Sequence, residues 1–143
     1  MEYDLRIANT VREMEKQSID CLIISRPENM YYLTNYQTVG NPTQVLLVFR
    51  NKKIHLITRE LEASNAEYRT NISYSFYFEY EDRFKKIADY ILNFSEMEKI
   101  ENIGFEYNSY RLCYKEQLNL ENFSPKTDSQ RIFHRMVCYN YYL

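Results

Sequence analysis

Two histidines are the residues of this chain best suited to bind a metal ion or to move a proton. His55 lies in the apolar segment 54–58, which is typical of a half-buried strand residue, and no second metal ligand lies near it in the sequence. His134 lies close to Arg131 and Arg135, a grouping that suits an anion contact or, as we favour, the solvated face of a terminal helix. We therefore expect no metal ligand and no catalytic residue here.

The three cysteines are an odd number without close pairs: Cys21, Cys113 and Cys138. No C-x-x-C motif exists, which excludes a zinc ribbon and a thioredoxin-type redox site. Cys21 opens an apolar segment and is expected to be a buried thiol, while no base is evident beside the other two. No G-x-S-x-G motif frames a serine nucleophile. Unpaired cysteines and an N-terminus without an apolar leader predict a reducing, cytoplasmic location.

Charge and glycine content exclude further classes of function. The 18 Lys and Arg residues against 20 Asp and Glu residues give a net charge of −2, so we expect neither a nucleic-acid partner nor a membrane partner. No apolar run approaches the ~18 residues of a membrane span. With only two Gly, the sequence cannot contain the glycine-rich phosphate loops of nucleotide-binding proteins.

The stretch 76–82, Phe-Tyr-Phe-Glu-Tyr-Glu-Asp, combines aromatic and acidic residues. We favour an edge strand that leads into a capped helix. The alternative is a surface that binds a partner, because Tyr is enriched at interfaces, and its candidate residues are Phe76 and Phe78, with Tyr74 just before the stretch. The acidic charges do not suit the stacking of nucleic acid bases.

The apolar pattern predicts the elements that position these residues. Residues 5–17 form an expected helix whose apolar stripe is Leu5, Ala8, Val11 and Met14, with Ile7 beside it. An apolar strand follows at 21–25, and Pro27 then favours the first turn of a short helix that includes residues 30–33. Residues 34–43 are a polar loop.

The second half of the chain continues the alternation of strands and helices. Segments 45–49 and 54–58 flank a polar turn and predict a hairpin, followed by a helix over 59–67 and a strand over 72–78. Asp82 is expected to cap a helix with the apolar residues Phe84, Ile87, Ala88, Ile91 and Leu92. A strand at 103–105 and a helix over 109–118 complete the prediction. The 143 residues thus predict one α/β domain with a mixed sheet.

Several segments in this order resemble one family. They are the strand Ile-Asp-Cys-Leu-Ile-Ile-Ser at 19–25, the string Pro-Glu-Asn-Met-Tyr-Tyr-Leu-Thr-Asn-Tyr at 27–36, the hairpin ending at 56–62, and Ile-Gly-Phe-Glu at 103–106. Together they resemble the N-terminal domain of the creatinase/prolidase family, which includes Xaa-Pro aminopeptidases, Xaa-Pro dipeptidases, creatinase and ectoine hydrolase-like enzymes. The segments 36–40 and 58–66 look most like the creatinase and ectoine hydrolase side.

The resemblance implies a three-layer α/β/α fold similar to ribonuclease H over residues 1–137, with 138–143 as an aromatic tail or an aborted linker. In full-length members a pita-bread catalytic domain follows and holds two divalent metal ions, Mn, Co or Zn in the peptidase branch. Its ligands are Asp, Asp, His, Glu and Glu in that order. This chain cannot supply that set around His55 or His134, so we expect no cofactor here and a non-catalytic domain.

The resemblance also implies where this domain acts. Family N-terminal domains pack near the active site of a neighbouring subunit, and the matching loop positions here are Asn35, Tyr36, Gln37 and Thr38. Replacing Tyr36 with Ala is expected to lower the activity of the full-length enzyme and to leave the stability of the isolated domain nearly unchanged. A homodimer is expected, with an interface on the strand residues 74–78 or on the tail residues Tyr139, Tyr141 and Tyr142.

Other interpretations stay open from the sequence. The chain suits the domain of a longer hydrolase, a stand-alone binding or regulatory module of the same fold, as in the large subunit of the FACT histone chaperone, or a truncated remnant. The substrate class of the full-length enzyme is also open among an iminopeptide, creatine and an ectoine-like compound.

Overall fold

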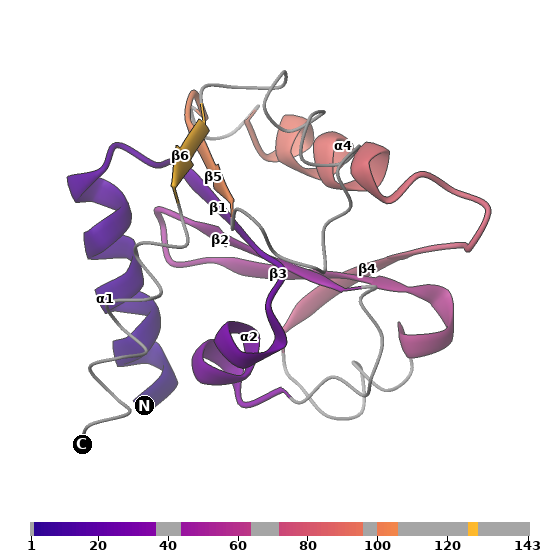
Figure 1. Ribbon diagram of the computed structural model, residues 1–143, viewed down its shortest axis with the longest axis horizontal. Coiled ribbons are helices and arrows are strands. Elements are labelled where there is room, and N and C mark those ends of the chain that lie inside the picture. The colour runs from indigo at the N-terminus through magenta and orange to yellow at the C-terminus, as the bar shows by residue number, and fades with distance from the viewer. Residues whose placement is uncertain (1, 37–43, 64–71, 96–99, 106–125, 129–143) are drawn as a thin grey trace.

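The structure of the chain is a computed structural model that describes residues 2–36, 44–63, 72–95, 100–105 and 126–128 (Figure 1). The elements, in chain order, are α1 (Glu2–Lys16), β1 (Cys21–Ile24), α2 (Pro27–Thr34), β2 (Val45–Phe49), β3 (Ile54–Arg59), β4 (Ser73–Tyr77), α4 (Arg83–Ser95), β5 (Ile103–Phe105) and β6 (Lys126–Asp128). Strand β6 was not predicted, because its short polar sequence, Lys-Thr-Asp, carries no apolar strand pattern.

The strands form one mixed sheet in the order β4-β3-β2-β1-β5-β6. The strands β1, β2 and β3 are antiparallel neighbours, with Ile23 opposite Leu47 and Leu47 opposite His55. By contrast, β5 runs parallel to β1, β6 to β5, and β4 to β3. The predicted hairpin and mixed sheet are confirmed, and β4 is an edge strand of the sheet formed by the described residues.

Helices cover both faces of this sheet, which gives three layers. Helices α1 and α2 lie on one face and α4 lies on the other (Figure 1). Alternate residues of β1 point to opposite sides: Leu22 and Ile24 join the core under α1 and α2, while Cys21 and Ile23 join the core under α4. Burial on both faces is the reason that β1 and β2 are apolar throughout.

Asp20 and Gly104 join β1 to β5. The Asp20 Oδ2 atom accepts the backbone N–H groups of Glu101 and Asn102, each at 2.9 Å. A Cβ atom on Gly104 would lie 3.0 Å from the Cδ1 atom of Ile19, so glycine permits this close packing. The first strand of the chain is thereby fixed to a segment more than 80 residues later.

The buried stripe of α1 differs from the predicted one. Its buried residues are Ile7, Thr10, Val11 and Met14, whereas Leu5 is 61% exposed. At 100° per residue, Leu5 lies about 160° around the helix from Ile7, which places it opposite the sheet. The three-residue steps of the prediction drift away from the true 3.6-residue period, and this error brought Leu5 into the stripe.

The face of α4 is confirmed at its centre and corrected at its end. Ile87 and Ile91 are buried against the sheet, as predicted. Leu92 is 53% exposed, and Phe94 takes the next buried position instead. Leu92 follows Ile91 directly and is therefore turned 100° away from the buried line. The helix begins at Arg83, directly after Asp82, whose backbone carbonyl accepts the N–H of Lys86 at 3.3 Å.

Two predicted helices extend beyond the residues that the structure describes. Residues 60–63 have helical backbone, which agrees with the first part of the helix predicted over 59–67. The remainder of that segment and the helix predicted over 109–118 lie outside the described residues.

Candidate functional site

The predicted substrate-access segment begins at the C-terminal end of α2. Asn35 follows the helix in the left-handed region at φ 59°, and its N–H donates to the carbonyl of Tyr31 at 2.8 Å. Asparagine tolerates this conformation better than most residues, so it suits the end of the helix. The Asn35 side chain is exposed, whereas Gln37 and Thr38 lie outside the described residues.

Tyr36 does not lie on the surface of this segment. It is 1% exposed and belongs to the core between the sheet and the helices α1 and α2. Its Oη atom accepts the Nε2–H of Gln44 at 3.3 Å, and its backbone N–H donates to the Thr34 Oγ1 atom at 3.0 Å. This burial corrects the expectation that loss of the Tyr36 side chain leaves stability unchanged. The side chain is a packing residue that fixes the start of the segment.

The segment returns to the sheet at a second pair of buried polar residues. Extending the pairing of Val45 with Ile57 by one step places Gln44 opposite Thr58. Both side chains are buried, and the Gln44 Oε1 and Thr58 Oγ1 atoms have no hydrogen-bond partner among the residues that the structure describes. Buried polar atoms of this kind are commonly satisfied by ordered water. The predicted loop thus begins after α2 and ends at β2 beside buried polar side chains, which the sequence pattern did not indicate.

The predicted interface residues of β4 have different environments. Tyr74 is partly buried and packs against the core on the α1 and α2 side. Phe76 and Phe78 are 42% and 37% exposed, and Tyr80, just beyond them, is 85% exposed. The other predicted interface residues, Tyr139, Tyr141 and Tyr142, lie outside the described residues. The favoured interpretation of 76–82 as an edge strand leading into a helix agrees with the positions of β4 and α4.

His55 is the centre of a polar cluster that sequence reasoning missed. The His55 Nδ1 atom lies 2.8 Å from the Ser73 Oγ atom, and the Nε2 atom lies 2.6 Å from the Ser75 Oγ atom. The imidazole stacks on the Tyr90 ring of α4, with ring centroids 3.8 Å apart. The signal in the sequence was the alternation of Ser73 and Ser75 in β4, which only the register with β3 brings beside the histidine.

The hydrogen bonds of this cluster favour the Nδ1–H tautomer of His55. In that tautomer the Ser73 hydroxyl donates to the carbonyl of Ile54 at 3.3 Å and accepts the Nδ1–H of the imidazole. The Nε2 atom then accepts the hydroxyl proton of Ser75. Burial lowers the pKa of His55 from 6.5 to about 4. A neutral, doubly hydrogen-bonded imidazole of this kind is a structural group and a weak base.

We expect the stability of the domain to fall as the pH drops from 6.5 toward 4, because of His55. In that range the unfolded histidine binds a proton that the folded one does not, since the folded pKa is the lower of the two. The expected loss from this residue is about 2 kcal/mol, below the full conversion of the pKa difference because Ser73 leaves one side of the cluster exposed. Denaturant unfolding at a series of pH values measures it.

A His55→Gln variant is the control for this pH dependence, because it lacks the titrating ring and retains polar atoms. Its stability should change less with pH than that of the unmodified chain over the same range, whatever its stability at pH 7. Parallel curves for the two proteins would show that His55 does not carry the effect.

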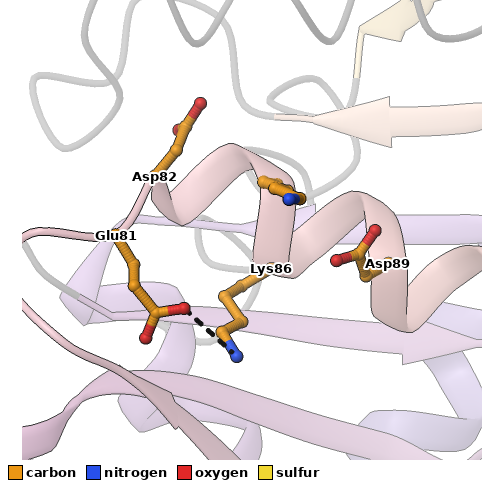
Figure 2. A pocket seen from close by; sticks show the side chains of 5 residues that line it. Glu81, Asp82, Lys86 and Asp89 are labelled. Carbon is orange, nitrogen blue, oxygen red and sulfur yellow. Dashed lines mark ion pairs between the residues drawn. The ribbon is translucent and has the colours of Figure 1, made fainter.

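Among the residues that the structure describes, no three His, Cys, Asp or Glu side chains lie close enough together to hold a metal ion. Cys21 is fully buried, and burial raises the pKa of its thiol far above the usual range, which leaves it unreactive. A hollow of about 370 Å³ at the start of α4 is lined by Glu81, Asp82, Lys85, Lys86 and Asp89 (Figure 2).

This hollow has mixed charge and is largely neutralised by its own residues. The Lys86 Nζ atom lies 3.5 Å from the Glu81 Oε2 atom, as the dashed line in Figure 2 shows. The backbone N–H of Phe78 donates to the Glu81 carboxylate at 3.0 Å and, together with Lys86, lowers the pKa of that carboxyl. These contacts organise the turn between β4 and α4. No helix in the described part of the chain has the length and apolar character needed to cross a membrane.

Comparison with known proteins gives a consistent result. The profile of the Creatinase/Prolidase N-terminal domain family matches residues 6–133. An uncharacterized hydrolase/peptidase of Sinorhizobium fredii is 27% identical over 133 residues, which cover 87% of this chain and 34% of that protein. This chain therefore spans about a third of the length of that relative.

Solved structures share the fold. A proline dipeptidase from Streptococcus pneumoniae matches with a TM-score of 0.77 at 16% identity, over 93% of this chain and 97% of that one. The N-terminal domain of a Xaa-Pro dipeptidase from Lactobacillus brevis matches with a TM-score of 0.72 at 17% identity, over 90% and 98% of the two chains. The prolidase of Pyrococcus horikoshii matches with a TM-score of 0.65 at 20% identity, over 92% of this chain and 34% of that one. The predicted α/β fold is confirmed.

Proposed function

The chain belongs to the creatinase/prolidase N-terminal domain family, and from this we propose that it is the non-catalytic N-terminal domain of a metal-dependent hydrolase of the Xaa-Pro peptidase or creatinase kind. We propose that it serves dimer assembly and substrate access there. The observation that carries the proposal is the family match over residues 6–133, which corresponds to only a third of the related hydrolase/peptidase and of the Pyrococcus prolidase.

The non-catalytic part of the proposal is supported by the chemistry of the described side chains. Two-metal hydrolysis requires several carboxylates and an imidazole that converge on the ions. The described residues contain no such cluster, and His55 uses both ring nitrogens in hydrogen bonds within the sheet. In our proposal the metal ions belong to a separate catalytic domain, and this chain provides no group for the bond-breaking step.

The substrate-access part is supported by the way the loop is held. The hydrogen bond between Tyr36 and Gln44 fixes the two ends of the segment 37–43 to each other, and Tyr36 anchors them in the core. Asn35 is exposed at the start of the segment and carries an amide that can donate to or accept from a polar substrate. In this proposal Tyr36 positions the loop, and Asn35, Gln37 and Thr38 are the residues available for contact.

The purified chain should show no hydrolysis of Xaa-Pro dipeptides or of creatine above the buffer rate, with Mn, Co or Zn added. The physical reason is the lack of a metal-binding cluster among the described side chains. Release of free amino acid or urea over time measures it, with a full-length Xaa-Pro dipeptidase as the positive control. Turnover that follows the chain through the last purification step and disappears with a chelator would overturn the non-catalytic role.

A further inference from the structure

We propose that strand β4 is the surface at which two copies of this chain pair, as antiparallel edge strands related by a twofold axis beside Phe76. The inference rests on the dimer-assembly role proposed above and specifies its interface. It follows from the position of β4 in the sheet, the exposed aromatic side chains along it, and the charges at its two ends.

The sequence of β4 lacks the features that usually protect a sheet edge. Natural edge strands are commonly blunted by lysine, proline or an inward-pointing charge, which prevents pairing with another chain. Ser73–Tyr77 contains only Ser, Tyr and Phe and carries no charge and no proline. Aromatic residues favour the strand conformation and pack well across a strand pair.

Three aromatic side chains form an exposed row along this edge. Phe76 contacts Phe78 edge to face, with ring centroids 5.7 Å apart, and Phe78 stacks on Tyr80 at 5.5 Å. Their exposure is unusual for side chains of this size, and contiguous apolar surface of this kind commonly marks a protein interface. The rings already contact one another, so little side-chain freedom remains to be lost on association.

A twofold axis at Phe76 makes this row complementary to itself. In an antiparallel pair about that axis, Phe76 lies opposite Phe76 of the second copy, and Tyr74 lies opposite its Phe78. Cross-strand aromatic pairs of this type stabilise a sheet, and all of them fall on one face. The two six-stranded sheets would then form one continuous sheet.

The charges at the two ends of the edge favour a second copy over an unrelated partner. Lys52 and Lys53 are exposed just before β3, which is parallel to β4 and starts at the same end of the sheet. Glu79 and Glu81 follow β4 at the opposite end, where Arg59 lies 3.8 Å from Glu79 and Lys86 lies 3.5 Å from Glu81. Antiparallel pairing brings Lys52 and Lys53 of each copy toward the largely exposed Glu79 of the other, twice in one dimer. Such complementarity sets the orientation of the partners.

Sedimentation velocity from about 5 to about 500 µM tests the interface. We expect the unmodified chain to form a dimer, and Phe76→Lys to weaken it at least about 100-fold, because a charge replaces the central aromatic contact. Leu5→Lys is the matched control: Leu5 is also exposed, but it lies on α1, away from β4, and should leave the dimer unchanged. A monomeric unmodified chain at the highest concentration, or a Phe76→Lys dimer of unchanged affinity, would overturn the interface.

A charge exchange tests the antiparallel orientation and does not depend on the folding of Phe76→Lys. Lys53→Glu and Glu79→Lys should each weaken self-association, and an equimolar mixture of the two should restore it, because each half then meets an opposite charge. A mixture as weak as the separate variants would overturn the antiparallel orientation. If these experiments show that the interface does not exist, the proposed non-catalytic role is unaffected. Only metal-dependent turnover by the chain would overturn that role.

Discussion

Replacing Ile87 with Asp is expected to lower the free energy of unfolding by about 5 kcal/mol, enough to unfold much of the protein at moderate temperature. Ile87 is buried at the centre of the face that α4 packs on the sheet. The substitution removes apolar contacts and places a carboxylate among buried apolar side chains, away from water. The loss of unfolding free energy should be smaller at acidic pH, because burial raises the pKa of the new carboxyl and favours its neutral form. Urea unfolding followed by circular dichroism measures the loss.

Leu92→Asp is the matched control for this change. It places the same side chain on the same helix, at an exposed position, so it carries a similar loss of helix propensity without the burial. We expect it to cost less than about 1 kcal/mol. Ile87→Asn, which adds polarity without charge, should give an intermediate loss. Equal unfolding midpoints for Ile87→Asp and Leu92→Asp would show that Ile87 is not buried between α4 and the sheet.

Tyr36→Ala is expected to lower the free energy of unfolding by about 3–5 kcal/mol, the range found when a large buried aromatic side chain is truncated. Tyr36 is among the largest fully buried side chains and packs in the core between the sheet and the helices α1 and α2. The truncation leaves a cavity and removes the oxygen that accepts a hydrogen bond from Gln44. The midpoint of thermal or denaturant unfolding of the isolated domain measures this effect.

Two further variants separate the contributions at this position. Tyr36→Phe keeps the ring and removes only the hydroxyl, so it should cost about 1 kcal/mol through the unpaired Gln44 amide. Tyr31→Ala removes an exposed ring from the neighbouring helix and should cost less than about 1 kcal/mol. If Tyr36→Ala has the stability of Tyr31→Ala, the side chain is not part of the core. Any loss of activity that Tyr36→Ala causes in a longer enzyme must therefore be measured below its unfolding temperature.

The elements that the sequence predicted best are those whose apolar residues repeat regularly over a buried surface. The hairpin of β2 and β3 has two uniformly apolar strands around a polar turn, and α4 carries Ile87 and Ile91 one turn apart. These patterns depend on neighbours within a few residues, so a local pattern is sufficient to find them. The string from Pro27 to Tyr36 likewise marked α2 at its correct place between β1 and β2.

The candidate site was predicted less well, because its residues acquire their roles from partners far away in the chain. Tyr36 looked like the start of a polar loop, and only the folded chain shows that its ring enters the core and meets Gln44. His55 lies 18 and 20 residues from its serine partners, which the parallel pairing of β3 with β4 brings beside it. A pattern of neighbouring residues contains no information on such a register.

The hydrogen bonds of Asp20 with Glu101 and Asn102 belong to the contact between β1 and β5. The late position of β5 in the chain determines when the sheet can be completed. During synthesis, β1, β2 and β3 can pair as soon as residue 59 has emerged, since they are antiparallel neighbours that follow one another along the chain, with only α2 between β1 and β2. The other side of β1 stays unpaired until β5 appears. At about 5–20 residues per second, the roughly 80 intervening residues take about 4–16 s. A strand that is fully buried in the finished domain is thus an open, apolar edge on the ribosome, and a chain released before residue 101 lacks the strand that covers it.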